Sequence, residues 1–554
     1  MAVPAFPLTS AARRPASGRS ALTRAGRRRA PVWLAATAAA TAVAVNLPLA
    51  YLAVRVLGAG WETLVRELAS RTTLALALRS LGLAAGVAVL SAAVALPLAW
   101  LVTRTDLPGR GAWAVLGALP LVFPSYVAAL TLVAFLGPSG FLQGWLAPLG
   151  AGRLPPLAYG YTGALLALAL FTYPYTYLLL VAALRGLDPA LEESSRSLGE
   201  GPWRTFFQVV LPQLRPTVAA GTLLVVLYTL SDFGAVSIVR YDTFTLSIYN
   251  AYRGLFDRTA AAVLALVLVA LTLALVALEA RAVRGSRPVR GRPSRSPAPV
   301  ALGRWKLPAL AGVALLSLAC VGIPVGVVVS WAARALAVGN PLGPLGAAWE
   351  AGVGSLTVSA AAAVAAVALA LPVAFWAVRY PGRLARGAER LTHSGYALPG
   401  LVIALAMVFF LTRFARPLYQ TAAALVAAYV IRFLPEAVAA TRSSLVAIAP
   451  VLEEAGRSLG RGPLAVFRSV TLPLLRPGLL AGGGLVFLTA MKELPATLIL
   501  RPIGFETLAT RVWSAASEGV YSEAALPALA LLAVSGLPIY WLTIRPTLGR
   551  AGSR

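Results

Sequence analysis

The chain has 554 residues, of which 59% are hydrophobic and 12% charged. Soluble globular proteins are about half apolar and a quarter charged, so this composition excludes an ordinary water-soluble enzyme. The 48 Lys and Arg residues outnumber the 20 Asp and Glu residues and give a formal net charge of +28. We attribute this excess to orientation in a membrane and expect no nucleic-acid binding, which requires an exposed basic surface.

The chain has one cysteine, Cys320, and one histidine, His393. A disulfide, a Cys/His metal cluster, haem ligation or an iron–sulfur cluster needs more thiols or imidazoles than these. We therefore expect no metal site, no cofactor and no catalytic residue. Cys320 is expected to be a small buried apolar residue and His393 to lie at the membrane interface.

A helix needs about 20 apolar residues to cross a hydrocarbon core of about 30 Å. By this measure the sequence predicts an all-α polytopic membrane protein with about twelve spans. The first span is too long for the apolar core of a secretory signal, so we interpret it as retained. The predicted spans are residues 32–57, 80–103, 112–136, 161–184, 217–239, 259–280, 308–334, 354–378, 395–412, 419–440, 478–500 and 526–544.

Arginines gather on one side of these spans. They precede the first span and follow the sixth, the eighth and the twelfth. The positive-inside rule therefore predicts that both termini are cytoplasmic. The loops on the opposite side carry the glutamates Glu62, Glu67, Glu350, Glu506, Glu518 and Glu523.

The two halves of the chain are related to each other. Leu191–Gly199 recurs as Leu452–Gly460 at a shift of 261 residues, and Ala95–Ala99 recurs as Ala370–Ala374 at a shift of 275. This pattern indicates a duplicated unit of six spans. Because six is even, both copies enter and leave on the same side, which predicts parallel repeats about a pseudo-twofold axis along the membrane normal.

The best-matched part of the repeat is the cytoplasmic stretch between the fourth and fifth spans of each half. Each copy predicts two short helices at an angle, because an acidic start is followed by a glycine break and then by a proline that can open the next helix. Such an elbow can present a helix to a partner. The acidic starts and glycine breaks are Glu192, Glu193 and Gly199 in the first copy, and Glu453, Glu454 and Gly460 in the second.

These two segments resemble the "EAA" coupling loop of the permease subunits of binding-protein-dependent ABC importers, which docks on a cytoplasmic ATPase subunit. The resemblance implies the type I permease fold of these importers. The two alanine positions of the motif hold Ser194 and Ser195 in the first copy and Ala455 and Gly456 in the second, all of them small residues. The resemblance assigns the motif's Glu to Glu193 and Glu454, its Gly to Gly199 and Gly460, and its downstream Pro to Pro212 and Pro473.

Further segments resemble one branch of this family, the fused ferric-iron permeases: Ser231–Gly234, Tyr249–Tyr252, Met491–Thr497 and Gly504–Arg511. The resemblance implies a bacterial inner-membrane subunit that works with a cytoplasmic ABC ATPase dimer and a periplasmic or lipoprotein substrate-binding protein. Permeases for thiamine, polyamines, sulfate and phosphonates share the coupling loop, so another small solute stays open as the cargo.

The chain does not have the sequence of a P-loop. That motif requires a lysine after glycine, and neither Lys306 nor Lys492 follows one. We therefore expect a separate subunit to hydrolyse ATP. A twelve-span secondary transporter driven by ions is the main rival, although it has no use for two matched cytoplasmic elbows. A polytopic membrane enzyme is a more distant third possibility.

Charged residues at membrane depth are costly and so invite a functional interpretation. Asp232 and the matched Glu493 lie in the outer part of the fifth and eleventh spans. One hypothesis is that they line the translocation path; the alternative is that they cap or pair locally, Glu493 with Lys492. Arg432 and Glu436, one helical turn apart, are predicted to form a structural ion pair, with contact to the substrate as the alternative. The expected path residues are Asp232, Phe233, Gly234, Lys492, Glu493 and Pro495.

The sequence thus predicts five segments. They are a basic cytoplasmic tail (1–31), a first permease repeat (32–280, coupling loop 185–216), a basic cytoplasmic linker (281–306), a second permease repeat (307–545, coupling loop 441–477) and a cytoplasmic tail (546–554).

Overall fold

The computed structural model describes residues 30–58, 60–150, 155–282, 299–337 and 345–539. In this part of the chain every regular element is helical, and the one strand-like pairing is an isolated bridge between Thr105 and Val300. The expected all-α fold is confirmed. Nearly all of the two expected tails, and residues 283–298 of the expected linker, lie outside the described residues.

The first half runs from the first helix to the end of the sixth predicted span. Its elements are α1 (Val32–Leu57), α2 (Trp61–Leu68), α3 (Arg71–Arg104), α4 (Arg110–Leu116), the 3₁₀ turn η2 (Leu119–Val122), α5 (Ser125–Leu136), α6 (Phe141–Leu146), α7 (Gly160–Gly186), α8 (Pro189–Ser197), α9 (Pro202–Thr205), the π-helical turn η4 (Phe206–Val210), α10 (Leu211–Ser231), α11 (Gly234–Ile238), α12 (Phe244–Arg253) and α13 (Arg258–Ala282).

The second half repeats this order. Its elements are α14 (Lys306–Ser317), the π-helical turn η6 (Leu318–Gly322), α15 (Ile323–Ala337), α16 (Leu345–Arg379), α17 (Arg383–Thr392), the 3₁₀ turn η7 (Ser394–Ala397), α18 (Gly400–Phe414), α19 (Ala422–Ala447), α20 (Pro450–Ser458), α21 (Pro463–Val466), the π-helical turn η9 (Phe467–Thr471), α22 (Leu472–Met491), α23 (Pro495–Leu500), α24 (Leu508–Glu518) and α25 (Tyr521–Ile539).

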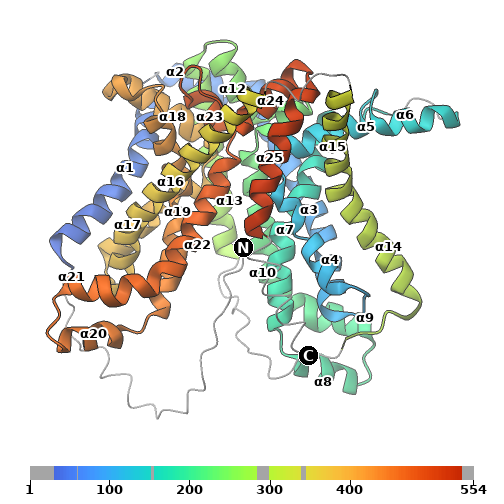
Figure 1. Ribbon diagram of the computed structural model, residues 1–554, viewed down its shortest axis with the longest axis horizontal. Helices are drawn as coiled ribbons and strands as arrows, with labels where there is room; N and C mark the ends of the chain where they lie inside the picture. The colour runs from blue at the N-terminus through green and yellow to red at the C-terminus, as the bar shows by residue number, and fades with distance from the viewer. Residues whose placement is uncertain (1–29, 59, 151–154, 283–298, 338–344, 540–554) are drawn as a thin grey trace.

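The structure confirms the internal repeat, although among the described residues α2 and α6 of the first half have no α-helical counterpart of their own in the second. The π-helical turns η4 and η9 begin 261 residues apart, and an interior proline lies at the equivalent place of α3 (Pro97) and α16 (Pro372). Helices α8 and α9 of the first half and α20 and α21 of the second lie at the same end of the molecule (Figure 1). Two parallel copies require this arrangement.

The spans differ from the prediction in number and continuity. Ten described helical segments are long and apolar enough to cross a membrane, and α18 and α25 are shorter apolar helices at the ninth and twelfth predicted spans. The predicted span 112–136 is wrong as a single helix: Pro120 and Pro124 lack the amide hydrogen that a continuous helix requires, and the segment forms α4, η2 and α5. The predicted spans 217–239 and 478–500 are likewise interrupted, because α10 ends at Ser231 and α22 at Met491.

The first helix of each half packs on the other half, which the sequence did not predict. α1 contacts α16, α17 and α18 of the second half. Val313 of α14 and Cys320 of η6 are buried with Leu98 of α3 and Tyr173 of α7. The expectation that Cys320 is a buried apolar residue is confirmed. Each bundle therefore includes a helix from the other half of the chain.

The end of the linker, residues 300–306, is attached to the end of α3 and to Asp106 just after it. The backbone N–H of Val300 donates to the Arg104 carbonyl (2.8 Å), and the Asp106 carboxylate accepts from the Leu302 N–H (2.9 Å) and Lys306 Nζ (3.0 Å). The Leu302 N–H and then Lys306 hold the pKa of Asp106 below its ordinary value. These contacts direct α14 towards the first half.

Candidate functional site

Each predicted elbow is present as two short helices joined at a glycine. In the first elbow (residues 189–205), α8 is followed by Gly199 at φ +86° and then by α9. In the second elbow (residues 450–466), α20 is followed by Gly460 at φ +77° and then by α21. Only glycine adopts this left-handed backbone without strain, so these two glycines set the angle between the helices.

The elbows expose the same residue types at matched positions. Glu193 and Glu454, the residues assigned to the coupling motif, are both exposed. Leu198 and Leu459, next to the glycines, are 83% and 81% exposed. Both elbows therefore present a leucine side chain to their surroundings at the same position of the repeat.

The other motif glutamates are buried, which the sequence did not predict. The carboxylate of Glu192 lies 3.1 Å from Arg104 Nη2 at the end of α3, and that of Glu453 lies 2.9 Å from Arg379 Nη2 at the end of α16. The two arginines are 275 residues apart, the shift that relates α3 to α16. The sequence contains a signal for these ion pairs: the arginine recurs at the 275-residue shift and the glutamate at the 261-residue shift.

The two arginines also bind the backbone near the start of each elbow. Arg104 Nη2 donates to the Leu184 carbonyl (3.0 Å), and Arg379 Nη2 donates to the Ile448 carbonyl (3.1 Å). A buried ion pair must offset the cost of removing both charges from water, and such pairs serve best to fix one arrangement of elements. Here they fix each elbow to the long helix α3 or α16.

The downstream prolines of the motif begin the next long helices. Pro212 occupies the first turn of α10 and Pro473 the first turn of α22, directly after the π-helical turns η4 and η9. Proline is accepted in a first turn because its missing N–H has no intrahelical partner there. Each elbow therefore leads without a loop into a membrane-spanning helix.

The interruptions after α10 and α22 are built alike around a carboxylate. Asp232 Oδ1 accepts from the N–H of Ala235 (2.9 Å), and Glu493 Oε1 accepts from the N–H of Ala496 (3.2 Å). The carboxylates thus cap the short helices α11 and α23. This is the local capping role that the sequence left open as the alternative.

The two interruptions face the same cavity of about 200 Å³ between the halves. All six expected path residues line it: Asp232, Phe233, Gly234, Lys492, Glu493 and Pro495. The cavity also contacts Tyr126 of α5, Tyr228 of α10 and Thr489 of α22. No group of three Asp, Glu, His or Cys side chains suited to a bound metal ion occurs among the residues that the structure describes.

The charge partners in this cavity differ from those expected. Arg432 pairs with Glu493 of the α22–α23 interruption (2.9 Å), and Glu436 accepts a hydrogen bond from Thr489 Oγ1 (3.1 Å). The predicted Arg432–Glu436 pair is therefore wrong. The reason is geometric: Gly400 leaves open the space that the Arg432 guanidinium occupies beside Glu493.

Lys492 reaches the other half of the chain. Its Nζ donates to the Leu121 carbonyl of η2 (3.0 Å), and the expected local pairing with Glu493 does not occur. Trp513 of α24 similarly donates to the Ser237 hydroxyl of α11 (3.3 Å). The cavity thus lies at a junction that both halves hold together.

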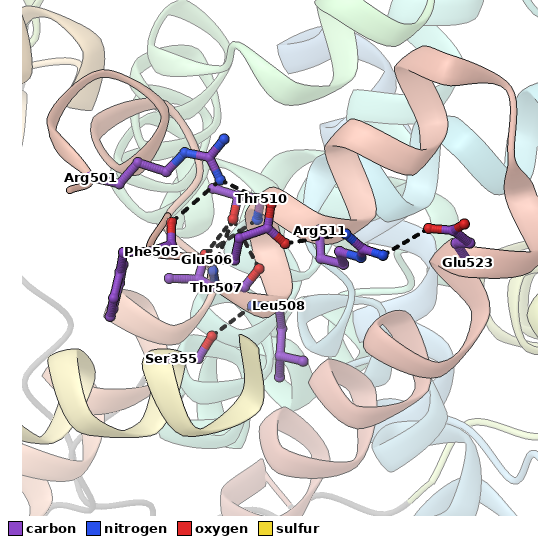
Figure 2. Close-up of polar contacts among 9 residues, drawn as sticks. All are labelled: Ser355, Arg501, Phe505, Glu506, Thr507, Leu508, Thr510, Arg511 and Glu523. Carbon is purple, nitrogen blue, oxygen red and sulfur yellow. Dashed lines mark hydrogen bonds and ion pairs between the residues drawn. The ribbon is translucent and has the colours of Figure 1, made fainter. Parts of the chain in front are cut away.

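A charged network orders the loop that follows α23 (Figure 2). Arg511 of α24 lies 2.9 Å from Glu523 of α25 and 3.5 Å from Glu506, which is also 3.5 Å from Arg501. Ser355 of α16 accepts from the Leu508 N–H (2.8 Å). These contacts hold the region that follows the second interruption, at the end of the molecule opposite the elbows (Figure 1).

A comparison with known protein families assigns the chain to a family. The model of the binding-protein-dependent transport system inner membrane component matches residues 95–285 and again residues 366–544. The chain belongs to this family. It is therefore a multi-pass inner-membrane permease subunit of a binding-protein-dependent ABC importer, and the two matches confirm its internal duplication.

Named relatives of this permease differ in how much of the chain they cover. It is 33% identical to the Fe(3+)-transport system permease protein FbpB 2 of Haemophilus influenzae over 525 residues, which are 93% of this chain and 98% of the relative. It is 32% identical to the sulfate transport system permease protein CysT of Escherichia coli over 32% of this chain and 65% of that relative. It is 31% identical to the molybdenum transport system permease protein ModB of Escherichia coli over 35% of this chain and 86% of that relative.

Proposed function

We propose that this permease imports ferric iron that a periplasmic or extracellular binding protein delivers, powered by ATP hydrolysis on a separate cytoplasmic ATPase dimer. The relative that resembles it along nearly its whole length is a ferric-iron permease, whereas the sulfate and molybdenum permeases match about a third of the chain. A match to a third of the chain covers about one copy of the repeat. Permeases for several different solutes contain such a copy, so these matches do not indicate the cargo. The two-copy architecture therefore favours iron.

Coupling to the ATPase is carried by the pair of elbows. They lie at one end of the molecule (Figure 1), with Leu198 and Glu193 exposed on one and Leu459 and Glu454 on the other. Each elbow runs directly into a long helix, α10 or α22, that ends at the central cavity. Movement of an elbow by the ATPase would shift this helix and the interruption at its far end.

The orientation follows from the position of these elbows. Since they meet a cytoplasmic ATPase, their end of the molecule is cytoplasmic, and the positive-inside rule gives both termini the same side. The segments 1–31, 281–306 and 546–554 then form cytoplasmic tails and a linker around two permease repeats, 32–280 and 307–545.

The cargo passes between the two interruptions. Asp232, Glu436 and Glu493 line the same cavity as Arg432 and Lys492, so carboxylates outnumber cations by one. Hard cations prefer oxygen ligands such as carboxylates. The Lys492–Leu121 contact joins the two halves at this cavity, and the Arg432–Glu493 pair lies in its wall, so rearrangement of both would open the cavity to one side.

Reconstitution tests this proposal directly. The permease, its ATPase and the binding protein in proteoliposomes should take up radioactive ferric iron in a vanadate-sensitive manner, and excess thiamine, polyamine, sulfate or phosphonate should not compete. Uptake that ignores vanadate but follows a proton or sodium gradient would instead support the secondary transporter. Vanadate-sensitive uptake of one of the competing solutes in place of iron would keep the importer and reject the cargo.

The elbows have their own test. Gly199→Pro together with Gly460→Pro removes the left-handed turns and should abolish co-purification of the ATPase. Co-purification at the wild-type level would reject the coupling assignment.

A further inference from the structure

A long apolar groove of about 1530 Å³ runs between α1 and the second half. Side chains of α1, such as Trp33 and Val45, form one wall, and those of α16, α18 and α19 form the other. The second elbow borders one end of the groove with Glu453 and Arg457. This groove is separate from the central cavity and has no part in the proposed path.

The walls of the groove lie among the membrane-spanning helices. α1, α16 and α19 are each long and apolar enough to cross the bilayer. Within the bilayer, contact between water and apolar side chains is unfavourable. We therefore expect hydrocarbon chains, and not water, to fill this groove. Its volume exceeds the roughly 300–1,000 Å³ of ordinary small-molecule pockets, which fits chains longer than those of a compact ligand.

Glu453 and Arg457 are the charged residues that line the groove. Arg379, which is outside the lining, binds Glu453 at 2.9 Å, whereas Arg457 lies 3.5 Å from it, so Arg379 offsets the charge of Glu453 and leaves that of Arg457 for the groove. The Arg457 side chain is 40% exposed, whereas that of Arg379 is 11% exposed. A guanidinium in this position has donors available for a phosphate group, which arginine binds with two parallel hydrogen bonds.

We propose that this groove binds an anionic glycerophospholipid, with its acyl chains along α1 and α16 and its phosphate at Arg457. Apolar walls with one basic end match the two parts of such a lipid. The bound lipid would fill the joint between α1, which belongs to the first repeat, and the elbow of the second. It would thereby support the position of that elbow.

The internal repeat supplies matched controls. Arg196 in α8 corresponds to Arg457 in α20 at the 261-residue shift, and Ala93 in α3 corresponds to Ala368 in α16 at the 275-residue shift. Both alanines are exposed on long helices, but only Ala368 lines the groove. Arg196 also lies outside the residues that line it.

The experiment measures lipids that stay bound to the full chain. The purified protein is incubated with vesicles of equal phosphatidylglycerol and phosphatidylcholine content, re-isolated and examined by native mass spectrometry. We expect phosphatidylglycerol to be retained over phosphatidylcholine, and Arg457→Gln to lower that preference about tenfold, the size of a charge-assisted hydrogen bond. Arg196→Gln should leave it unchanged. Ala368→Trp should displace the bound lipid, whereas Ala93→Trp should not.

Three results would overturn the proposal. Equal retention of the two lipids by the wild type would indicate annular lipid only. Equal losses in Arg457→Gln and Arg196→Gln would indicate a general effect of charge, and full retention in Ala368→Trp would place the chains elsewhere. Should Ala368→Trp fail to fold, the quenching of Trp33 by brominated phosphatidylglycerol decides. It should exceed quenching by brominated phosphatidylcholine in the wild type, and this excess should vanish in Trp33→Phe and in Arg457→Gln.

Discussion

Arg379 Nη2 lies 2.9 Å from Glu453 Oε1, and the same pair recurs in the first half as Arg104 and Glu192 at 3.1 Å. In each copy the end of a long membrane helix is joined to the first helix of an elbow. The joint is buried on both sides, so neither charge is stabilised by bulk water. This repeated joint gives the ATPase-facing end of the chain a defined attachment to α3 and α16.

Breaking one of these joints should destabilise the protein. Arg379→Gln leaves Glu453 buried with only its weaker partners, and loss of one member of a buried ion pair costs about 3–5 kcal/mol. We expect a lower midpoint of thermal unfolding in detergent and reduced ATP-driven uptake. Arg383→Gln, an exposed change in the neighbouring helix α17, serves as the control.

A variant with the two charges exchanged tests whether the ion pair itself, and not the arginine alone, is needed to hold the elbow. Arg379→Glu combined with Glu453→Arg restores opposite charges and should recover part of the uptake lost by either change alone. The ratio of ATP hydrolysed to ion transported should rise in the single variants and fall back in the double variant. An unchanged ratio in the single variants would contradict a coupling role for this pair.

The exposed leucines of the elbows should hold the ATPase. Leu198→Asp together with Leu459→Asp places charge on the two apolar positions that an apolar docking surface would cover, so co-purification of the ATPase should be lost. The control is Ile503→Asp, which also replaces an exposed apolar side chain by a carboxylate. Ile503 is 89% exposed in the loop after α23, away from the elbows, so co-purification of the ATPase should not change. Pull-down from cells that express both subunits measures the difference, and equal recovery of the ATPase with the double variant and with Ile503→Asp would reject these leucines as the contact.

Gly400 should be required for the charge pairing in the cavity. A methyl group at this position would overlap the Arg432 guanidinium and approach Glu493, so Gly400→Ala must displace that ion pair. We expect reduced uptake with normal insertion into the membrane. Gly312→Ala in α14, where no atom lies within 4 Å of the added carbon, is the control. Wild-type uptake by Gly400→Ala would show that the Arg432–Glu493 geometry is dispensable.

The attachment of the linker end should depend on the ionised Asp106. The Leu302 N–H and Lys306 keep its pKa below the ordinary value of about 4, so the contact is complete above that pH and is lost on acidification through the lowered pKa. Asp106→Ala should remove the contact at neutral pH and increase tryptic cleavage beside Lys306. An unchanged cleavage rate would contradict this attachment.

The sequence was sufficient for features that local chemistry determines. Gly199 and Gly460 followed by prolines predicted the two elbows, because only a few residue types permit such a turn. The matched segments at two constant shifts predicted the duplicated architecture. Hydropathy located the membrane helices, although Pro120 and Pro124 interrupted one of them.

The remaining features depend on which distant residues meet. Arg432 had a partner one turn away in Glu436, yet the fold brings Glu493 closer through the space that Gly400 leaves. Sequence spacing predicts ion pairs between residues of one helix, but it does not predict a pair between residues 61 positions apart. The packing of α1 on the second half is likewise a tertiary result, since its apolar surface is compatible with either half.

Substitutions of Asp232 can distinguish the two roles considered for the carboxylates at the interruptions, which are lining the ion path and capping a short helix. Glu493 also pairs with Arg432, so Asp232 is the simpler of the two to test. Asp232→Asn keeps a side-chain oxygen that can accept from Ala235 but removes the charge, whereas Asp232→Ala removes both and should cost about 0.5–2 kcal/mol as a lost cap. If the carboxylate lines the ion path, both variants should lose uptake while only the alanine variant loses thermal stability. If the carboxylate only caps α11, uptake should follow stability and the asparagine variant should transport normally. Iron uptake and thermal unfolding measured on the same preparations distinguish these outcomes.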